Sequence, residues 1–245
     1  MNTSETLLNI NSNASSTTPS PRTSRAKLVL MASAGMLVFG GLMLTLWGWA
    51  DWHGFFAHPA RCAVVALMVL RFAQAMFSLD PGIIRRGRDA NRVPERSFFT
   101  LLYASLLVVM ASPYFDARGL WVLPGGDATR YAGLMLFMTG FALSVWAQRH
   151  LGRFFSGHVT LQEGHRLITD GPFTYIRHPR YVGLILLFLG LALVYRSTTG
   201  AAAGAVCAIL FLTRIPREEA LMAREFGEVW ISYARRTKRL LPGIY

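Results

Sequence analysis

Long apolar runs constrain the fold of this chain more than any other feature. Four near-continuous runs each have roughly the 20 residues that a helix needs to cross a bilayer. They cover 27–50, 61–79, 97–115 and 130–149. Of the 245 residues, 53% are hydrophobic and only 16% are charged, so few charges interrupt these runs. We therefore expect four transmembrane helices in the first part of the chain.

Two shorter apolar runs follow, at 181–195 and 199–213. Each is nearer ~15 residues, and the turn-forming segment 196–200 separates them. They predict a helical hairpin that either just spans the bilayer or enters it and returns. The expected fold class is all-α: a polytopic integral membrane protein with about five to six transmembrane helices, including this hairpin.

The same pattern divides the chain into three parts. Residues 1–26 are rich in Ser, Thr and Asn and predict a disordered cytoplasmic tail. Residues 27–149 hold the four N-terminal helices, and 150–245 form a core built on the hairpin 181–213 and a final helix 216–236.

The final helix is expected to be amphipathic and cytoplasmic. Pro216, followed by Arg217 and two glutamates, has the signature of a helix start. One apolar or aromatic stripe with helical spacing follows: Met222, Phe226, Val229, Trp230 and Tyr233. Such a helix suits the membrane interface or a lid over the preceding loop.

The formal net charge of +12 follows the membrane topology. Lys and Arg concentrate before the first run, after the second, after the fourth and after the hairpin. The alternate connectors hold only Arg61, Arg118, Arg130 and Arg196. The positive-inside rule then places both termini and the connector after the fourth run in the cytoplasm. Attraction to anionic lipid explains the charge better than nucleic acid, so we expect the lipid bilayer as a partner and no nucleic acid.

Polar chemistry is crowded into one cytoplasmic connector, residues 156–183, which holds histidines, arginines, acids and two Xaa-Pro steps. Because a hairpin has both ends on one side, the segment 177–181 should lie close to 214–219. These segments and the final helix predict a site at the membrane interface, open to water on one side and to lipid on the other. Arg71, within the second apolar run, either contacts a substrate head group or pairs structurally.

Several other chemistries lack their motifs. His158, His165 and His178 are candidate zinc ligands, but their spacing has no HExxH-type pairing, and we expect no metal. The chain has no P-loop, no GxGxxG after a strand and no GxSxG. The usual phosphate cradles and serine nucleophile are therefore absent.

A longer pattern does match a known family. It consists of His165, Leu167, Ile168, Gly171, Phe173, Arg177, His178, Pro179, Tyr181 and Gly183, then Arg214, Glu218 and Glu219, then Phe226, Gly227, Glu228 and Tyr233. This pattern closely resembles the isoprenylcysteine carboxyl methyltransferase family. Phospholipid N-methyltransferases and small bacterial thiol methyltransferases are its wider relatives. The resemblance covers roughly residues 145–243.

The resemblance implies methyl transfer from S-adenosylmethionine within the membrane, with S-adenosylhomocysteine as the product. The implied cofactor contacts are His158, His165, Arg166, Leu167, Ile168, Phe173, His178, Pro179, Arg180, Tyr181 and Glu218. Arg214 matches an arginine on the substrate side. Phe173 replaces a usual tyrosine, and His158 stands where glutamine can occur.

The chemistry of these side chains agrees with those roles. Glu218 can take the cofactor ammonium, and aromatic rings can face the adenine or the sulfonium. Arg214 would orient an anionic acceptor such as a carboxylate, whereas a thiol or amine acceptor needs a base, for which Glu219 or a neutral histidine is the candidate. We expect a lipophilic or small membrane-partitioning acceptor. An NADPH-dependent, sterol-reductase-like enzyme and a non-catalytic lipid-binding protein stay open as alternatives.

Overall fold

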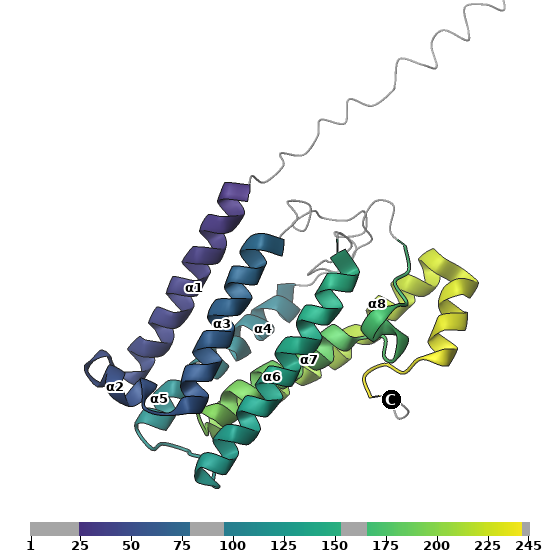
Figure 1. Ribbon diagram of the computed structural model, residues 1–245. Coiled ribbons are helices and arrows are strands. Elements are labelled where there is room, and N and C mark those ends of the chain that lie inside the picture. Colours follow the sequence, from purple (N-terminus) through teal and green to yellow (C-terminus); the bar gives the residue numbers. More distant parts are fainter. Residues whose placement is uncertain (1–24, 79–95, 153–165, 242–245) are drawn as a thin grey trace, which may run out of the picture.

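A computed structural model of the protein describes residues 25–78, 96–152 and 166–241 (Figure 1). Within these ranges the chain is helical and forms no strand, only two isolated bridges. The elements are α1 (Arg25–Trp47), the 3-10 helix η1 (Trp49–Asp51), α2 (Trp52–Phe56), α3 (Pro59–Ser78), α4 (Arg96–Met110), α5 (Ser112–Ala117), α6 (Gly126–Leu151), the 3-10 helix η4 (Gly171–Thr174), α7 (Pro179–Val194) and α8 (Thr198–Arg236). The all-α class is confirmed.

Membrane-crossing helices are confirmed by length and composition. Among the described residues, three helices qualify: Ser97–Ala117, Gly126–Leu151 and Thr198–Arg236. A fourth qualifies if the bent pair Ser33–Trp47 and Trp49–Phe56 counts as one span, and Pro59–Leu70 and Pro179–Val194 are shorter apolar helices. The polytopic fold is thus confirmed, and the count of five to six spans stays a prediction.

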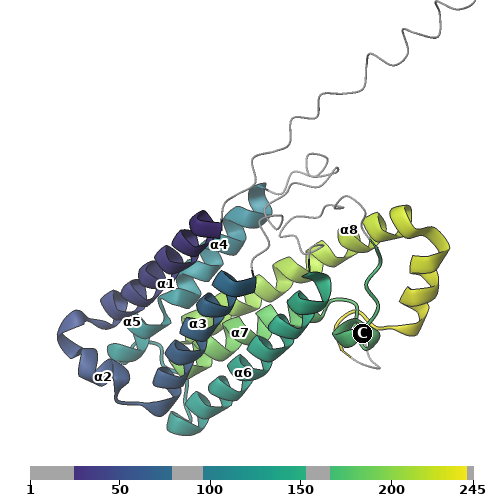
Figure 2. The same cartoon turned by 45° about the horizontal axis from the view of Figure 1, so that its top comes forward.

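The long helices lie side by side in a bundle (Figures 1 and 2). α6, α7 and α8 pack in chain order, α4 lies against α8, and α1 contacts α3 and α5. The largest apolar cluster joins the N-terminal helices to α6 and α7 through buried residues that include Met43, Val64, Phe137 and Leu191. This cluster therefore packs the turn end of the hairpin against the N-terminal helices.

Glycines bring α6 and α7 into backbone contact. A Cβ on Gly133 would lie 2.8 Å from the carbonyl oxygen of Gly190, and one on Gly140 would lie 2.6 Å from that of Gly183. The two glycines of each helix are seven residues apart, two helical turns, so they fall on one face. Small residues at matching heights let antiparallel helices approach closely, as in membrane bundles. This contact fixes the position of the first turn of α7 along the axis of α6.

The predicted hairpin is confirmed as α7, a short turn and α8. Arg196 has a positive φ of 48°, and the Ser197 hydroxyl accepts a hydrogen bond from Gly200 N at 2.9 Å, which caps the start of α8. The Thr198 amide donates to the Trp121 carbonyl at 3.0 Å. The turn is therefore stabilised both by its own hydrogen bond and by a hydrogen bond to the connector between α5 and α6.

The expected helix start at Pro216 is wrong, because α8 continues through this proline. Residues on both sides hold the helix together: Ile215 and Leu221 are buried, and the ion pair from Arg214 to Glu218 spans the proline at 3.1 Å. The break comes instead at Gly227, whose φ of 50° and ψ of −127° favour glycine.

This break also corrects the predicted apolar stripe. Trp230 and Tyr233 are buried, but Val229 is 65% exposed. The predicted stripe assumes a regular helix through Gly227, and this non-helical residue rotates the faces that follow it. The chain turns back after the break (Figure 1), so the last turns of α8 return towards η4.

A buried charge cluster closes the end of the bundle at the α7–α8 turn. Asp116 accepts two hydrogen bonds of 2.7 Å from Arg130 and one of 3.3 Å from Arg61. Arg130 also donates to the Val194 carbonyl at 2.7 Å, and Arg61 donates to the Gly54 carbonyl at 2.8 Å. The cluster therefore ties together α2, α3, α5, α6 and α7.

Candidate cofactor and acceptor site

Two adjacent carboxylates of α8, Glu218 and Glu219, form the centre of the candidate site. They lie beyond the apolar segment 199–213 and face the first turn of α7, as the hairpin predicted. Their side chains are 24% and 13% exposed. Because consecutive helical residues point about 100° apart, each carboxylate meets a different set of partners.

Glu219 is surrounded by basic side chains. Its Oε1 accepts from Arg177 Nε at 2.8 Å and lies 3.3 Å from His178 Nε2. Its Oε2 accepts from Arg239 Nε at 3.0 Å and lies 2.9 Å from Arg239 Nη2. Both oxygens are therefore engaged, and the carboxylate joins three segments of the chain.

These contacts set the protonation of Glu219. Burial alone would raise the pKa of its carboxyl group, but hydrogen bonds from His178, Arg239 and Arg177 outweigh burial and lower the pKa from 4.5 to about 2. A carboxylate with this pKa stays ionised at neutral pH and is a weak proton acceptor. The geometry therefore favours an organising role for Glu219 over the predicted role of base.

Glu218 lies among groups that a ligand can share. Its Oε1 accepts a hydrogen bond from the Tyr181 hydroxyl and pairs with Arg214 Nε at 3.1 Å. Its Oε2 lies 3.7 Å from His178 Nδ1. Glu218 is the more exposed of the two glutamates, so it is the better placed to meet a cationic ligand.

Aromatic rings lead from this carboxylate into the bundle. The His178 and Tyr181 rings are stacked with centroids 5.7 Å apart, and Tyr181 stacks on Phe211 at 4.9 Å. Arg214 lies on the same side, with its guanidinium 4.7 Å from the Phe98 ring centroid and 5.6 Å from that of Phe99. The site is therefore charged at the open end of the hairpin and becomes aromatic towards the interior of the bundle.

The remaining predicted site residues occupy different environments. Ile168 and Phe173 are buried against Ala147 of α6. Pro179 is buried at the start of α7, Leu167 and Arg180 are half-buried, and Arg166 is exposed. His158 and His165 lie outside the described residues, as does the side chain of Arg71. In the described ranges, no group of three or more His, Cys, Asp or Glu is positioned to hold a metal ion.

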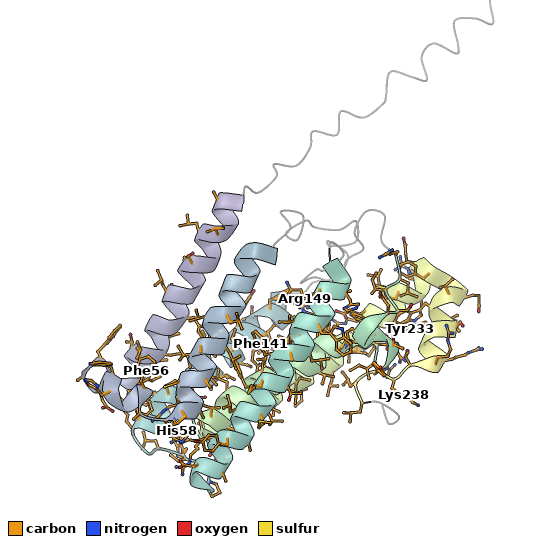
Figure 3. All side chains as sticks on the ribbon, viewed as in Figure 1. Phe56, His58, Phe141, Arg149, Tyr233 and Lys238 are labelled. Carbon is orange, nitrogen blue, oxygen red and sulfur yellow. The ribbon has the colours of Figure 1, made fainter. Side chains whose placement is uncertain are left out.

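Sequence reasoning missed the contribution of the C-terminal segment. Arg177 donates to the Ala234 carbonyl at 2.9 Å and to the Thr237 carbonyl, and the Tyr233 hydroxyl donates to the Phe173 carbonyl at 2.7 Å. Arg177 and Tyr233 belong to the matched pattern but had no assigned role, and Arg239 carried no signal beyond its charge. Figure 3 shows Tyr233 and Lys238 at the far end of the molecule from Phe56 and His58.

The fold and the site together define an all-helical membrane protein whose charged, aromatic site lies at the open end of a helical hairpin. Residues 128–229 match the family model described as "Phospholipid methyltransferase". The chain is 31% identical over 113 residues to Protein-S-isoprenylcysteine O-methyltransferase B of Arabidopsis thaliana, covering 45% of this chain and 57% of the relative. The predicted resemblance to isoprenylcysteine carboxyl methyltransferase-like membrane methyltransferases is therefore confirmed.

Two further similarities bear on fold and function. A solved structure of the eukaryotic intramembrane Ras methyltransferase ICMT aligns with a TM-score of 0.59 over 89% of this chain and 77% of that one, at 19% identity, which shows a shared fold. Steroid 5-alpha-reductase DET2 of Solanum lycopersicum is 28% identical over 113 residues, 46% of this chain and 41% of that protein. The chain thus spans less than two thirds of the length of the curated relatives it matches.

Proposed function

We propose that the protein is an S-adenosylmethionine-dependent methyltransferase of the membrane, acting on a lipophilic or membrane-partitioning acceptor with a carboxylate of the isoprenylcysteine type. The proposal rests on one observation: His178 and Tyr181 lie close to Arg214 and Glu218. These residues come from the two ends of one hairpin, and the resemblance to the methyltransferase family implies one shared site for them.

The donor set suits the proposed cofactor, which carries an ammonium, a carboxylate and a sulfonium. Glu218 offers a carboxylate for the ammonium, and histidine or backbone N–H groups can take the cofactor carboxylate. The stacked rings of His178 and Tyr181 offer π-faces for the sulfonium or the adenine. When bound, S-adenosylmethionine supplies an electrophilic methyl group. The protein has to hold it in line with the acceptor and exclude water.

Arg214 is the proposed contact for the acceptor. It is buried between Glu218 and the rings of Phe98 and Phe99, on the side of the site where α4 packs against α8. A guanidinium is suited to bidentate recognition of a carboxylate. The neighbouring aromatic rings suit a lipophilic chain attached to that carboxylate.

The protonation of Glu219 favours O-methylation. A carboxylate acceptor is already ionised at neutral pH, so its oxygen attacks the methyl carbon without losing a proton. A thiol or an ammonium acceptor has to lose one, and Glu219, with a pKa lowered to about 2, does not serve as that base. N-methylation of a phospholipid and S-methylation of a small thiol are therefore the less favoured acceptor classes.

The proposed orientation follows from the charges. The connector between α6 and α7 and the segment after the apolar part of α8 are rich in Arg, and the positive-inside rule therefore favours the cytoplasmic side for the site and both termini. A water-soluble cofactor then enters from the cytoplasm, and the acceptor enters from the bilayer.

Calorimetry with S-adenosylhomocysteine tests the cofactor assignment. The purified full chain in detergent should bind the product, and Glu218→Gln should weaken binding by about ten-fold or more, because it removes the charge that faces the ammonium. The rival NADPH-dependent reductase is favoured by the similarity to the steroid reductase. It predicts NADPH binding that S-adenosylhomocysteine does not displace, and that result would replace our proposal.

A further inference from the structure

Residues 237–240, here the C-terminal strap, follow α8 and lie beyond residue 229, where the family match ends. The strap runs beside the segment that leads into α7, with an isolated parallel bridge between Ile176 and Lys238. This contact therefore lies outside the part of the chain that the family model covers.

Backbone hydrogen bonds join the strap to two residues of the candidate site. The Arg177 amide donates to the Lys238 carbonyl at 2.7 Å, and the His178 amide donates to the Arg239 carbonyl at 3.0 Å. His178 is also the residue that precedes the first turn of α7. The strap thus fixes the backbone from which the His178 ring projects towards both glutamates.

Two side chains anchor the strap at this position. Arg239 binds Glu219 Oε2 through Nε at 3.0 Å and Nη2 at 2.9 Å. Leu240, the next residue, packs against the apolar cluster that contains Tyr181 and Phe211. A polar anchor and an apolar anchor on consecutive residues hold the strap to α8 and α7 at once.

The ion pair of Arg239 joins a partly exposed guanidinium to a mostly buried carboxylate. Glu219 is mostly buried and is shared with Arg177 and His178, so removing Arg239 leaves one carboxylate oxygen without its cationic donors. A buried carboxylate that loses a charged partner is destabilised by more than an exposed one. The strap then keeps Leu240, its backbone hydrogen bonds to 177–178 and the contacts of Thr237 with Arg177 and Tyr233.

We infer that Arg239 is a positioning residue: by anchoring the strap on Glu219 it sets the orientation of Arg177 and His178, and through them the binding of the cofactor. The second half of this inference rests on the proposed function. Arg239 itself does not touch the reacting atoms. Its effect reaches the ligand through the two amides that the strap carbonyls hold and through the shared carboxylate.

The first experiment needs no ligand. Hydrogen–deuterium exchange of the full chain in detergent is compared for the unchanged protein, Arg239→Gln and Arg235→Gln. Arg235 lies exposed on the last turn of α8, so its substitution removes the same charge without touching Glu219. In Arg239→Gln the amides of Arg177 and His178 should exchange at least about ten-fold faster, because their acceptors are released. Unchanged exchange at these amides would overturn the inference.

The second experiment measures S-adenosylhomocysteine binding to the same three proteins and to Arg239→Lys. Arg239→Gln should raise the Kd by about ten-fold, Arg235→Gln should leave it unchanged, and Arg239→Lys should fall between them because it keeps one charged donor. Thermal unfolding of each protein separates this effect from a loss of folded material. Equal Kd values for Arg239→Gln and Arg235→Gln would refute the positioning role while the proposed function stands.

The two experiments also separate the two proposals. If Arg239→Gln speeds exchange at Arg177 and His178 but the unchanged protein does not bind S-adenosylhomocysteine, the proposed function fails. The anchoring of the strap by Arg239 is then still supported.

Discussion

Asp116→Asn tests the buried charge cluster that ties the N-terminal helices to the hairpin. The Asp116 side chain is only 3% exposed and accepts from Arg130 twice at 2.7 Å and from Arg61 at 3.3 Å. The amide has no negative charge, so two buried guanidinium groups are left facing each other. Breaking a buried pair in this way typically costs about 3–5 kcal/mol. For a chain of this size that corresponds to a loss of roughly 10 °C in the midpoint of thermal unfolding.

Asp127→Asn provides the matched control for this substitution. Asp127 makes one ion pair, at 3.2 Å to His58, and its side chain is 75% exposed. Exposed pairs contribute about 0–1 kcal/mol, so this variant should unfold within a few degrees of the unchanged protein. Thermal unfolding in detergent, followed by tryptophan fluorescence, compares the three proteins. Equal midpoints for Asp116→Asn and Asp127→Asn would refute the reasoning that the buried cluster holds the bundle together.

Two further predictions concern packing and pH. Gly140→Ala places a methyl group 2.6 Å from the Gly183 carbonyl oxygen. This crowding should destabilise the protein by about 1–3 kcal/mol, measured by thermal unfolding. An unchanged unfolding midpoint would contradict the close approach of α6 and α7. Because the pKa of Glu219 falls from 4.5 to about 2 on folding, its contribution of about 3 kcal/mol is complete above pH 4.5 and is lost as the pH falls towards 2. Glu219→Gln should therefore flatten the fall in unfolding midpoint over this pH range, and an unchanged profile would show that other groups control it.

Much of the fold could be predicted because membrane helices leave a local signal. The apolar runs correspond to α1, α3, α4 with α5, and α6, and the hairpin follows from two short runs and a polar turn. The continuation of α8 through Pro216 could not be predicted in the same way. It depends on the packing of Ile215 in a cluster with Tyr181, a residue distant in the sequence.

Part of the candidate site could also be predicted from the sequence, and part could not. The hairpin alone predicted that His178 and Tyr181 would lie near Glu218 and Glu219, and the hydrogen bonds between them confirm it. The strap anchored by Arg239 was not predicted, because its position depends on the reversal of the chain after the break in α8. The low pKa of Glu219 was equally hidden, since it arises from three partners in two segments, Arg177 and His178 before α7 and Arg239 in the strap.

Transfer of a labelled methyl group tests the central claim most directly. The purified protein is incubated with methyl-labelled S-adenosylmethionine and, separately, with a prenylated cysteine, phosphatidylethanolamine and a hydrophobic thiol. We predict that the label enters the prenylated cysteine as a base-labile methyl ester and that Arg214→Ala abolishes the transfer. Label in the phospholipid or the thiol alone would contradict the assigned acceptor, and folded protein that labels none of the three would contradict the account of the site as a methyltransferase.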